Sequence, residues 1–283
     1  MMLVNAIEML NKAKKGNYAV PQFNINNLEW TKAILEECED NDSPVILGVS
    51  EGATKYMGGY NTVASLVKGL IKDLNINVSV CLHLDHGKSF DSCKKAMESG
   101  FTSVMIDASM YELDENIKIV KEVINLAKQK NVSVEAEVGH VGGIEDSEEV
   151  DVLYAEISDC KKLVIETNVN FLAPALGSVH GEYKGEPKIN FERMNEINKI
   201  VGIPLVLHGG TGLSDEIIKN SIENGINKIN FNTELQMAWS QAVRMFIENY
   251  STYDPRKIIS SGVIAIKNVV RYKINLLGCA NKN

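Results

Sequence analysis

The chain has 283 residues, of which 45% are hydrophobic and 23% are charged, close to the average for soluble globular domains. This composition excludes disorder as the main state, and the length fits either two ordinary domains or one α/β barrel of about 250 residues. The net charge of −8 argues against a general nucleic-acid-binding surface, because such a surface requires a basic face.

The N-terminal segment and the cysteines give no indication of export or of a membrane anchor. Residues 1–17 lack a long apolar run after a basic start, and Leu3, Ile7 and Leu10 lie at helical spacing, so we expect a short amphipathic helix and no secretory signal. The five cysteines are scattered without a CxxC pair, which argues against disulfides and against a thiolate zinc site. No apolar run approaches the ~18 residues of a membrane span. We therefore expect a cytoplasmic protein with neither membrane nor nucleic acid as a partner.

Eight apolar segments follow one another along the chain and resemble buried strands. They cover residues 18–24, 44–50, 78–85, 102–107, 132–139, 171–176, 203–210 and 228–232. Most are uniformly apolar, which is typical of parallel strands that are buried on both faces.

Helical patterns occupy the segments between these strands. In residues 112–130 an apolar face recurs at Ile117, Val120, Val123, Ile124 and Ala127. Strand–helix alternation at about 35 residues per unit predicts parallel strands with right-handed crossovers, and so one (β/α)8 TIM barrel domain over residues 1–283. A doubly wound open sheet is the alternative, but no GxGxxG follows the first strand. The glycine-rich and acidic segment 139–158 is expected to be a mobile functional loop, and about 259–277 an extra C-terminal helix.

Polar side chains stand at the end of almost every predicted strand, where a TIM barrel carries its active site. Four of the five histidines fall at such positions. His86, His180 and His208 follow three different strands, and three imidazoles with an open fourth position are typical of catalytic zinc. Glu137 is a candidate fourth or alternative ligand. A histidine taken alone is more often a structural residue, so the zinc prediction depends on the shared placement of all three.

Glycine-rich turns after the last two strands predict a phosphate site. HGGTG at 208–212 exposes backbone N–H groups and the Thr211 hydroxyl. Asn232 and Thr233 open the helix that follows, and a helix N-terminus favours an anion. Lys184 offers a positive charge, although a solvated loop lysine is the more common case.

The motifs of the whole chain, taken in order, resemble those of the class II (zinc-dependent) fructose-bisphosphate aldolase family. The resemblance is carried by HLDHG, SVEAEVG with GGIED, APALGSVHG, LVLHGGTG and KINFNTE, and also by YAVPQFNINN, SPVILGVSEG, GFTSVMIDAS and YDPRK. It implies a TIM-barrel lyase of glycolysis and gluconeogenesis. Such an enzyme reversibly cleaves fructose 1,6-bisphosphate to dihydroxyacetone phosphate and glyceraldehyde 3-phosphate.

The resemblance also implies the catalytic and metal-binding residues. By motif, His86, His180 and His208 bind Zn²⁺, and Glu137 binds it when the ion lies deeper. Asp85 matches the acid/base that acts on the C4 hydroxyl, and Glu145 in the long loop matches the carboxylate that handles the proton on C3. The resemblance implies that His83 lies next to the metal ligands and does not bind the metal itself.

Further motif residues match substrate and phosphate contacts. They are Asn24, Ser50, Gly181, Lys184, Gly209, Thr211, Asn230, Asn232 and Thr233. Arg256 matches an arginine that reaches the distal phosphate from a neighbouring subunit, which implies a homodimer or homotetramer. A monovalent cation, Na⁺ or K⁺, near the backbone of HG and HGG is also usual in the family.

Several alternatives stay open at this point. Related aldolases act on tagatose 1,6-bisphosphate; the residues HGGT and KINFNTE favour the fructose enzyme, whereas the C-terminal VVRYKINLLGCANKN resembles the tagatose enzymes. A non-catalytic phosphosugar-binding barrel and a zinc hydrolase are further candidates, but the former should lack Asp85 or a zinc histidine. Phe231, where the family more often has Val or Ile, is interpreted as a packing variant. His140 is interpreted as a solvent-exposed loop histidine rather than a zinc competitor.

Overall fold

The computed structural model describes residues 3–145, 148–150, 154–181, 183 and 185–283, with the backbone alone for 143–145 and 148–150. The strands of the barrel are β1 (Val20–Asn24), β2 (Val45–Val49), β3 (Val80–Gly87), β4 (Ser103–Ile106), β5 (Ser133–Val138), β8 (Phe171–Pro174), β10 (Leu205–Leu207) and β11 (Ile226–Phe231). All eight pair in parallel and close in the order β1-β11-β10-β8-β5-β4-β3-β2. This result confirms the predicted (β/α)8 barrel and excludes the open sheet.

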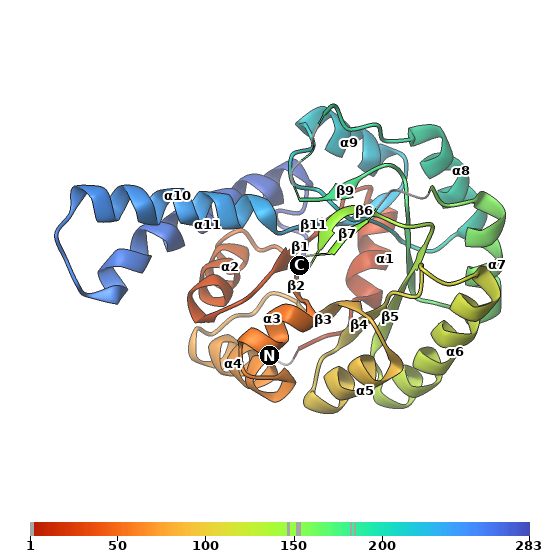
Figure 1. Ribbon diagram of the computed structural model, residues 1–283, viewed down its shortest axis with the longest axis horizontal. Coiled ribbons are helices and arrows are strands. Elements are labelled where there is room, and N and C mark those ends of the chain that lie inside the picture. Colours follow the sequence, from red (N-terminus) through yellow and green to blue (C-terminus); the bar gives the residue numbers. More distant parts are fainter. Residues whose placement is uncertain (1–2, 146–147, 151–153, 182, 184) are drawn as a thin grey trace.

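Helices surround the barrel, as Figure 1 shows. Their bounds are α1 (Ile7–Gly16), α2 (Leu28–Asp40), α3 (Glu51–Tyr56), α4 (Tyr60–Asp73), α5 (Phe90–Ser99), α6 (Leu113–Lys130), α7 (Ile157–Thr167), α8 (Phe191–Val201), α9 (Asp215–Glu223), α10 (Thr233–Asn249) and α11 (Pro255–Leu276). The apolar face predicted in α6 is buried, and Ser214 caps α9 by accepting from the N–H of Ile217. No helix in the described part of the chain is both long and apolar enough to cross a membrane.

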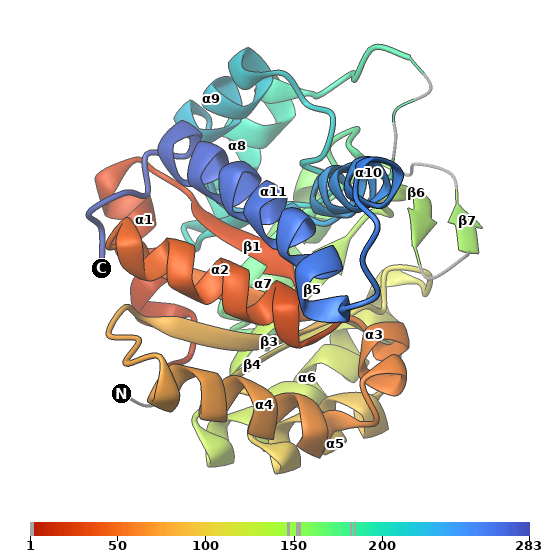
Figure 2. The ribbon, with the colours of Figure 1, turned by 90° about the vertical axis from the view of Figure 1, so that its left-hand side faces the viewer.

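The segment predicted as one long loop contains regular structure. Its strands β6 (Gly142–Glu145) and β7 (Glu148–Val150) pair antiparallel, and β6 also pairs in parallel with β9 (Val179–His180). In Figure 2, β6 and β7 lie beyond the same end of the barrel as α3, which follows β2 directly. The small sheet therefore brings the segment after β8 against the segment after β5 at the carboxyl ends of the strands.

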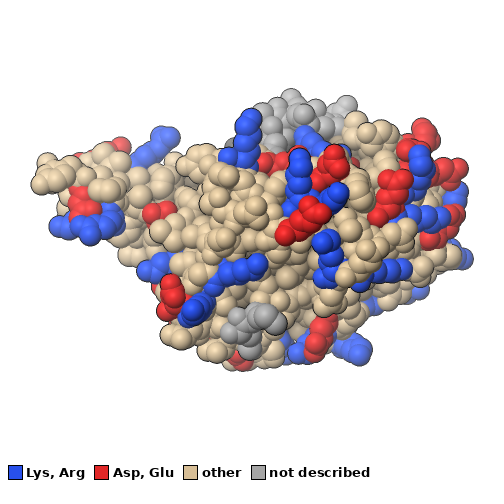
Figure 3. Space-filling model, turned by 90° about the horizontal axis from the view of Figure 1, so that it is seen from below, with Lys and Arg blue, Asp and Glu red and all other residues tan. Residues whose placement is uncertain are grey.

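The last two helices form a hairpin that projects from the barrel (Figure 1). The extra helix begins at Pro255 instead of 259, because the Asp254 side chain caps it by accepting from the N–H of Arg256. Trp239 of α10 lies against Trp30 of α2, with ring centroids 5.6 Å apart. On the face drawn in Figure 3, acidic and basic side chains are intermixed over the barrel, while the hairpin is mostly uncharged.

Candidate active site and metal centre

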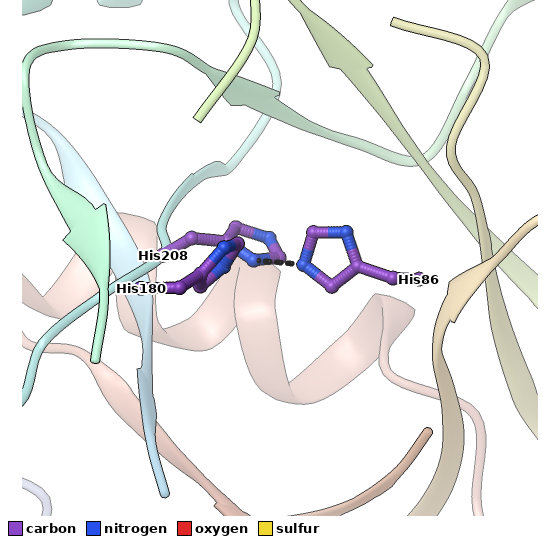
Figure 4. Close-up of side chains that lie close together, drawn as sticks. All are labelled: His86, His180 and His208. Carbon is purple, nitrogen blue, oxygen red and sulfur yellow. Dashed lines mark hydrogen bonds between the residues drawn. The ribbon is translucent and has the colours of Figure 1, made fainter. Parts of the chain in front are cut away.

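Three histidines from distant parts of the sequence converge at the carboxyl end of the barrel. His86 stands near the end of β3, His180 ends β9, and His208 follows β10. Their ligand atoms all lie within 4.8 Å of one another, and Figure 4 shows the three rings pointing toward a common centre. The structure thus brings together the three residues that the sequence predicted as a group.

The end of β3 has an irregular backbone that orients His86. The pairing of β3 with β4 shifts register between Leu84 and Gly87. His86 lies within this irregularity at φ 48°, a left-handed conformation that residues other than glycine rarely adopt. Local strain of this kind concentrates at functional sites, and here it directs the His86 ring toward the other two histidines.

Two of the rings are each held by a carboxylate on the outer nitrogen. His86 Nδ1 lies 3.0 Å from Asp107 Oδ2, and His208 Nε2 lies 2.7 Å from Glu135 Oε1. Burial raises the pKa of Glu135, but the Lys228 ammonium together with the rings of His208 and His83 outweighs burial and lowers that pKa to about 2. Hydrogen bonds from His86 and Ser109 likewise overcome burial and hold the pKa of Asp107 well below its usual range. Both carboxylates are therefore ionised at neutral pH and accept hydrogen bonds from the rings.

The inner nitrogens of the same rings face each other. His86 Nε2 lies 2.7 Å from His208 Nδ1 (Figure 4). When both outer nitrogens donate to carboxylates, the inner nitrogens of neutral rings present lone pairs to a common centre where a cation can bind. Burial lowers the pKa of His208, and burial with the adjacent rings lowers the pKa of His180 well below its usual range, which favours the neutral, metal-binding form. The donor set and its outer carboxylates therefore fit a zinc ion.

Glu137 belongs to a second group of possible ligands. Its carboxylate, the Asp107 carboxylate and the His86 ring have ligand atoms that all lie within 4.8 Å of one another. Glu137 is buried on β5, and its Oε1 accepts from the N–H of Val141 at 3.1 Å. The two groups share His86, so the residues present a place for an ion on either side of that ring.

Asp85 is buried beside the histidines and held by two amides. Asn24 Nδ2 donates to Asp85 Oδ2 at 2.8 Å, and Asn230 Nδ2 lies 3.4 Å from Asp85 Oδ1. The amides come from β1 and β11, which are neighbours across the closing point of the barrel. Amide donors favour the ionised carboxylate, so Asp85 is arranged as a proton acceptor.

The predicted phosphate-binding turns lie next to one another. Gly209 has φ +67°, and a Cβ there would lie 2.1 Å from the carbonyl oxygen of Val179, so this close approach requires glycine. Thr211 Oγ1 accepts from the N–H of Glu234 in the first turn of α10, at 3.3 Å. Tyr183 Oη donates to the Gly209 carbonyl at 2.9 Å and so joins the turn after β9 to the turn after β10.

A cavity of about 570 Å³ opens where the segments after β1, β2 and β11 meet. Its lining includes the predicted substrate residues Asn24, Ser50 and Asn232, together with Trp30 and Trp239. Ser50 also caps α3 by accepting from a backbone N–H. The predicted contacts from three different strand ends therefore border one cavity.

Some predicted residues are not brought to this site. Lys184 and the side chain of Glu145 lie outside the described residues. The Arg256 side chain is 89% exposed and pairs with Asp254 at the start of α11, at the outer tip of the hairpin in Figure 1. Within one chain, Arg256 is therefore remote from the histidines.

The interpretation of His140 as a solvent-exposed residue is wrong. Its side chain is only 12% exposed, and its Nδ1 lies 2.7 Å from Ser109 Oγ. Ser109 lies in the segment after β4, so this contact holds the ring near the end of that strand. Neither of the two possible ligand groups in the described part of the chain includes His140.

Sequence reasoning missed Lys228 and underrated Asp107 and Glu135. Lys228 is fully buried in β11, and its Nζ donates to Glu135 Oε2 at 2.7 Å. A lysine two residues before Asn230 in a predicted buried strand was the available signal, because alternate residues share a face. Phe231, on the opposite face, is buried against Phe23 with ring centroids 6.0 Å apart, in agreement with a packing variant.

The fold and this site define a TIM-barrel protein in which three histidines converge and could hold a metal ion. The family model described as fructose-bisphosphate aldolase class-II matches residues 4–282. The chain is 55% identical to the fructose-bisphosphate aldolase of Geobacillus stearothermophilus over 284 residues, covering 100% of this chain and 99% of that protein. It is 52% identical to the enzyme of the same name from Staphylococcus aureus strain Mu50, with the same coverage.

Solved structures agree with these relatives. The YdjI aldolase from Escherichia coli K12 matches with a TM-score of 0.88 at 30% identity, covering 99% of this chain and 98% of that one. A putative fructose-1,6-biphosphate aldolase from Coccidioides immitis matches with a TM-score of 0.89 at 26% identity, covering 98% and 96%. The chain belongs to the class II fructose-bisphosphate aldolase family.

Proposed function

We propose that this protein is a carbon–carbon lyase that reversibly cleaves fructose 1,6-bisphosphate to dihydroxyacetone phosphate and glyceraldehyde 3-phosphate, in glycolysis and gluconeogenesis in the cytoplasm. The observation that carries the proposal is the convergence of His86, His180 and His208 beside the buried carboxylate of Asp85. The names of the full-length relatives support fructose as the sugar. We further propose that residues 1–283 form one catalytic barrel domain.

His86, His180 and His208 would hold Zn²⁺, with Glu137 as the ligand for a deeper position. When bound, zinc supplies Lewis-acid polarisation of the substrate oxygens next to the bond that breaks. Asp107 and Glu135 orient the two rings that they contact, at 3.0 Å and 2.7 Å.

Proton transfer is assigned to two carboxylates. Asp85 takes the proton of the C4 hydroxyl as the C3–C4 bond breaks, and the amides of Asn24 and Asn230 hold this carboxylate in place. Glu145 is proposed to return a proton to C3. A lysine that forms a Schiff base is not required in this mechanism.

Both substrate phosphates need local positive groups, because the chain as a whole carries a net charge of −8. We assign one phosphate to Gly181, Lys184, Gly209 and Thr211. Asn24, Ser50, Asn230, Asn232 and Thr233 are assigned to the sugar and to further phosphate contacts. Na⁺ or K⁺ near the glycine-rich turns would add local charge.

The distal phosphate is assigned to Arg256 of a second subunit in a homodimer or homotetramer. Support comes from the position of this exposed side chain on a projecting hairpin. The hairpin also exposes large apolar residues, namely Met237, Met245, Ile247, Tyr250, Tyr253, Ile264 and Tyr272. Apolar surface of this kind is typical of an interface between subunits.

The proposal is tested by a coupled cleavage assay with fructose and tagatose 1,6-bisphosphate, each with and without a chelator. We expect preference for the fructose sugar and loss of activity in EDTA that added zinc restores. Activity that survives EDTA would contradict the zinc mechanism. If metal-loaded protein cleaves neither sugar, a phosphosugar-binding barrel is the better description. Preference for tagatose bisphosphate would reverse the assignment of the sugar.

The role of Asp85 is tested separately with Asp85→Ala. We expect turnover to fall by about 10²–10⁴, because the proton acceptor is lost, while the zinc content measured by atomic absorption stays at the wild-type value. Asp91→Ala, on the exposed side of α5, is the control and should retain both properties. Near-normal turnover in Asp85→Ala would remove this residue from the mechanism.

A further inference from the structure

His140 lies at the end of a chain of hydrogen bonds that leads to the predicted metal ligand His86. His140 Nδ1 lies 2.7 Å from Ser109 Oγ, and Ser109 Oγ lies 2.7 Å from Asp107 Oδ1. The other carboxylate oxygen, Asp107 Oδ2, lies 3.0 Å from His86 Nδ1. Four side chains from β3, the segment after β4 and the segment after β5 therefore form one continuous path.

The direction of each hydrogen bond follows from the number of protons available. The Ser109 hydroxyl donates its single proton to Asp107 Oδ1 at 2.7 Å. The Ser109 oxygen then receives its other hydrogen bond from His140, whose Nδ1 carries the proton. At the far end His86 Nδ1 donates to Asp107, and the lone pair of His86 Nε2 faces the metal centre.

The path also restrains the Asp107 carboxylate. The backbone N–H of Ser109 donates to Asp107 Oδ1 at 3.0 Å, in addition to the hydroxyl at 2.7 Å. Because His140 Nδ1 carries a proton, it cannot accept from the Ser109 hydroxyl, so the hydroxyl proton stays on the side of Asp107. The His140 side chain is only 12% exposed, and its Nδ1 also lies 3.8 Å from Glu137 Oε1.

We propose that His140 is a positioning residue for the metal centre: through Ser109 and Asp107, it fixes the tautomer and the orientation of the ligand His86. This inference rests on the proposed metal site. His140 would not touch the substrate or the metal. It also immediately precedes the segment that forms β6, so the start of this segment is tied to the ligand by hydrogen bonds.

The test measures zinc affinity by competition with a chromophoric chelator, which does not depend on catalysis. We expect His140→Ala to weaken zinc binding by about tenfold, the lower end of the effect of removing an outer partner of a metal ligand. His140→Asn should restore affinity to within about threefold, because the Asn amide places a donor near the position of Nδ1. The visible spectrum of the Co²⁺-loaded protein should shift in His140→Ala and return toward wild type in His140→Asn.

A double variant separates action through Ser109 from a general loss of structure. If His140 acts through that hydroxyl, zinc affinity in the Ser109→Ala/His140→Ala protein should equal that in Ser109→Ala alone. Ser158→Ala, whose exposed hydroxyl contacts Asp159 on α7, is the matched control and should bind zinc like the wild type. Unchanged zinc affinity in His140→Ala, or strictly additive losses in the double variant, would overturn the inference.

The wild-type protein provides a second test that needs no variant. Nitrogen-15 NMR of the histidine rings in the zinc-loaded protein should show a proton on His140 Nδ1 and on His86 Nδ1. A bare His140 Nδ1 would overturn the inference even if the variants failed to fold. Failure of wild-type protein to bind zinc would instead contradict the proposed function, so the two failures are distinguishable.

Discussion

Lys228 is a buried cation within the barrel, and its partner Glu135 also orients a predicted metal ligand. The side chains of both residues are fully buried, with Nζ and Oε2 2.7 Å apart. Glu135 uses its other oxygen for His208 at 2.7 Å. The lysine therefore keeps ionised the carboxylate that holds the imidazole.

We predict that Lys228→Met destabilises the metal-free protein by about 3–5 kcal/mol at pH 7, because it leaves a buried carboxylate without its cation. The measurement is urea unfolding followed by circular dichroism. Burial without the ammonium raises the pKa of Glu135 in this variant, so the carboxylate becomes neutral as the pH falls. The difference in free energy of unfolding between wild type and Lys228→Met should therefore become smaller as the pH falls from 7 to 4.

The control for this prediction removes both charges. Lys228→Met/Glu135→Gln should unfold at a higher urea concentration than Lys228→Met alone, since no unpaired buried charge remains. Equal stability of wild type and Lys228→Met at pH 7 would show that the ion pair has no such role.

At the scale of elements, a glycine allows α10 and α11 to approach closely. A Cβ on Gly262 would lie 2.3 Å from Trp239 Cδ1, and Trp239 is itself packed against Trp30 of α2. A methyl group at this position must therefore displace an aromatic ring that joins the hairpin to the barrel.

We predict that Gly262→Ala destabilises the protein by about 1–3 kcal/mol through overpacking. Gly69→Ala is the matched control, because Gly69 also lies within a helix but a Cβ there meets nothing within 4 Å. It should be neutral or stabilising by about 0.5–1 kcal/mol, the usual preference for alanine in helices. The stability of both variants is measured by thermal unfolding. Equal changes in stability in Gly262→Ala and Gly69→Ala would exclude a packing role for Gly262.

At the scale of the whole molecule, Arg256 lies far from the three histidines of its own chain, which leads to a prediction about subunit assembly. If the arginine acts in a neighbouring subunit, Arg256→Ala and Asp85→Ala inactivate different sites. When the two variants are coexpressed, about a quarter of wild-type activity should return, because half of the dimers are mixed and each has one intact site.

The matched control coexpresses Asp85→Ala with the double variant Asp85→Ala/Arg256→Ala, which cannot form an intact site. Activity is measured by the coupled cleavage assay, and the mixed assembly is verified by differently tagged subunits. Recovery no greater than in this control would show that Arg256 does not act between subunits.

The sequence by itself determined the class of fold and which kinds of side chain, histidines and carboxylates, lie at the site. Eight apolar segments at regular spacing predicted the barrel, because parallel strands buried on both faces have a recognisable composition. The histidines could be grouped from their positions along the chain, since all barrel strands end on the same side. The motifs around Asp85 and the three histidines placed the chain in its family.

Only the tertiary structure decided which side chains form hydrogen bonds with those histidines. Asp107 contacts His86 across 21 positions, and Glu135 contacts His208 across 73. Such pairs depend on strand register and on irregularities such as the one at the end of β3, and neither is encoded by apolar periodicity. The contact of His140 with Ser109 joins residues 31 positions apart, and no local sequence pattern indicates it. The physical reason is the same in each case: local sequence specifies which faces are apolar, whereas closure of the barrel determines which polar groups meet.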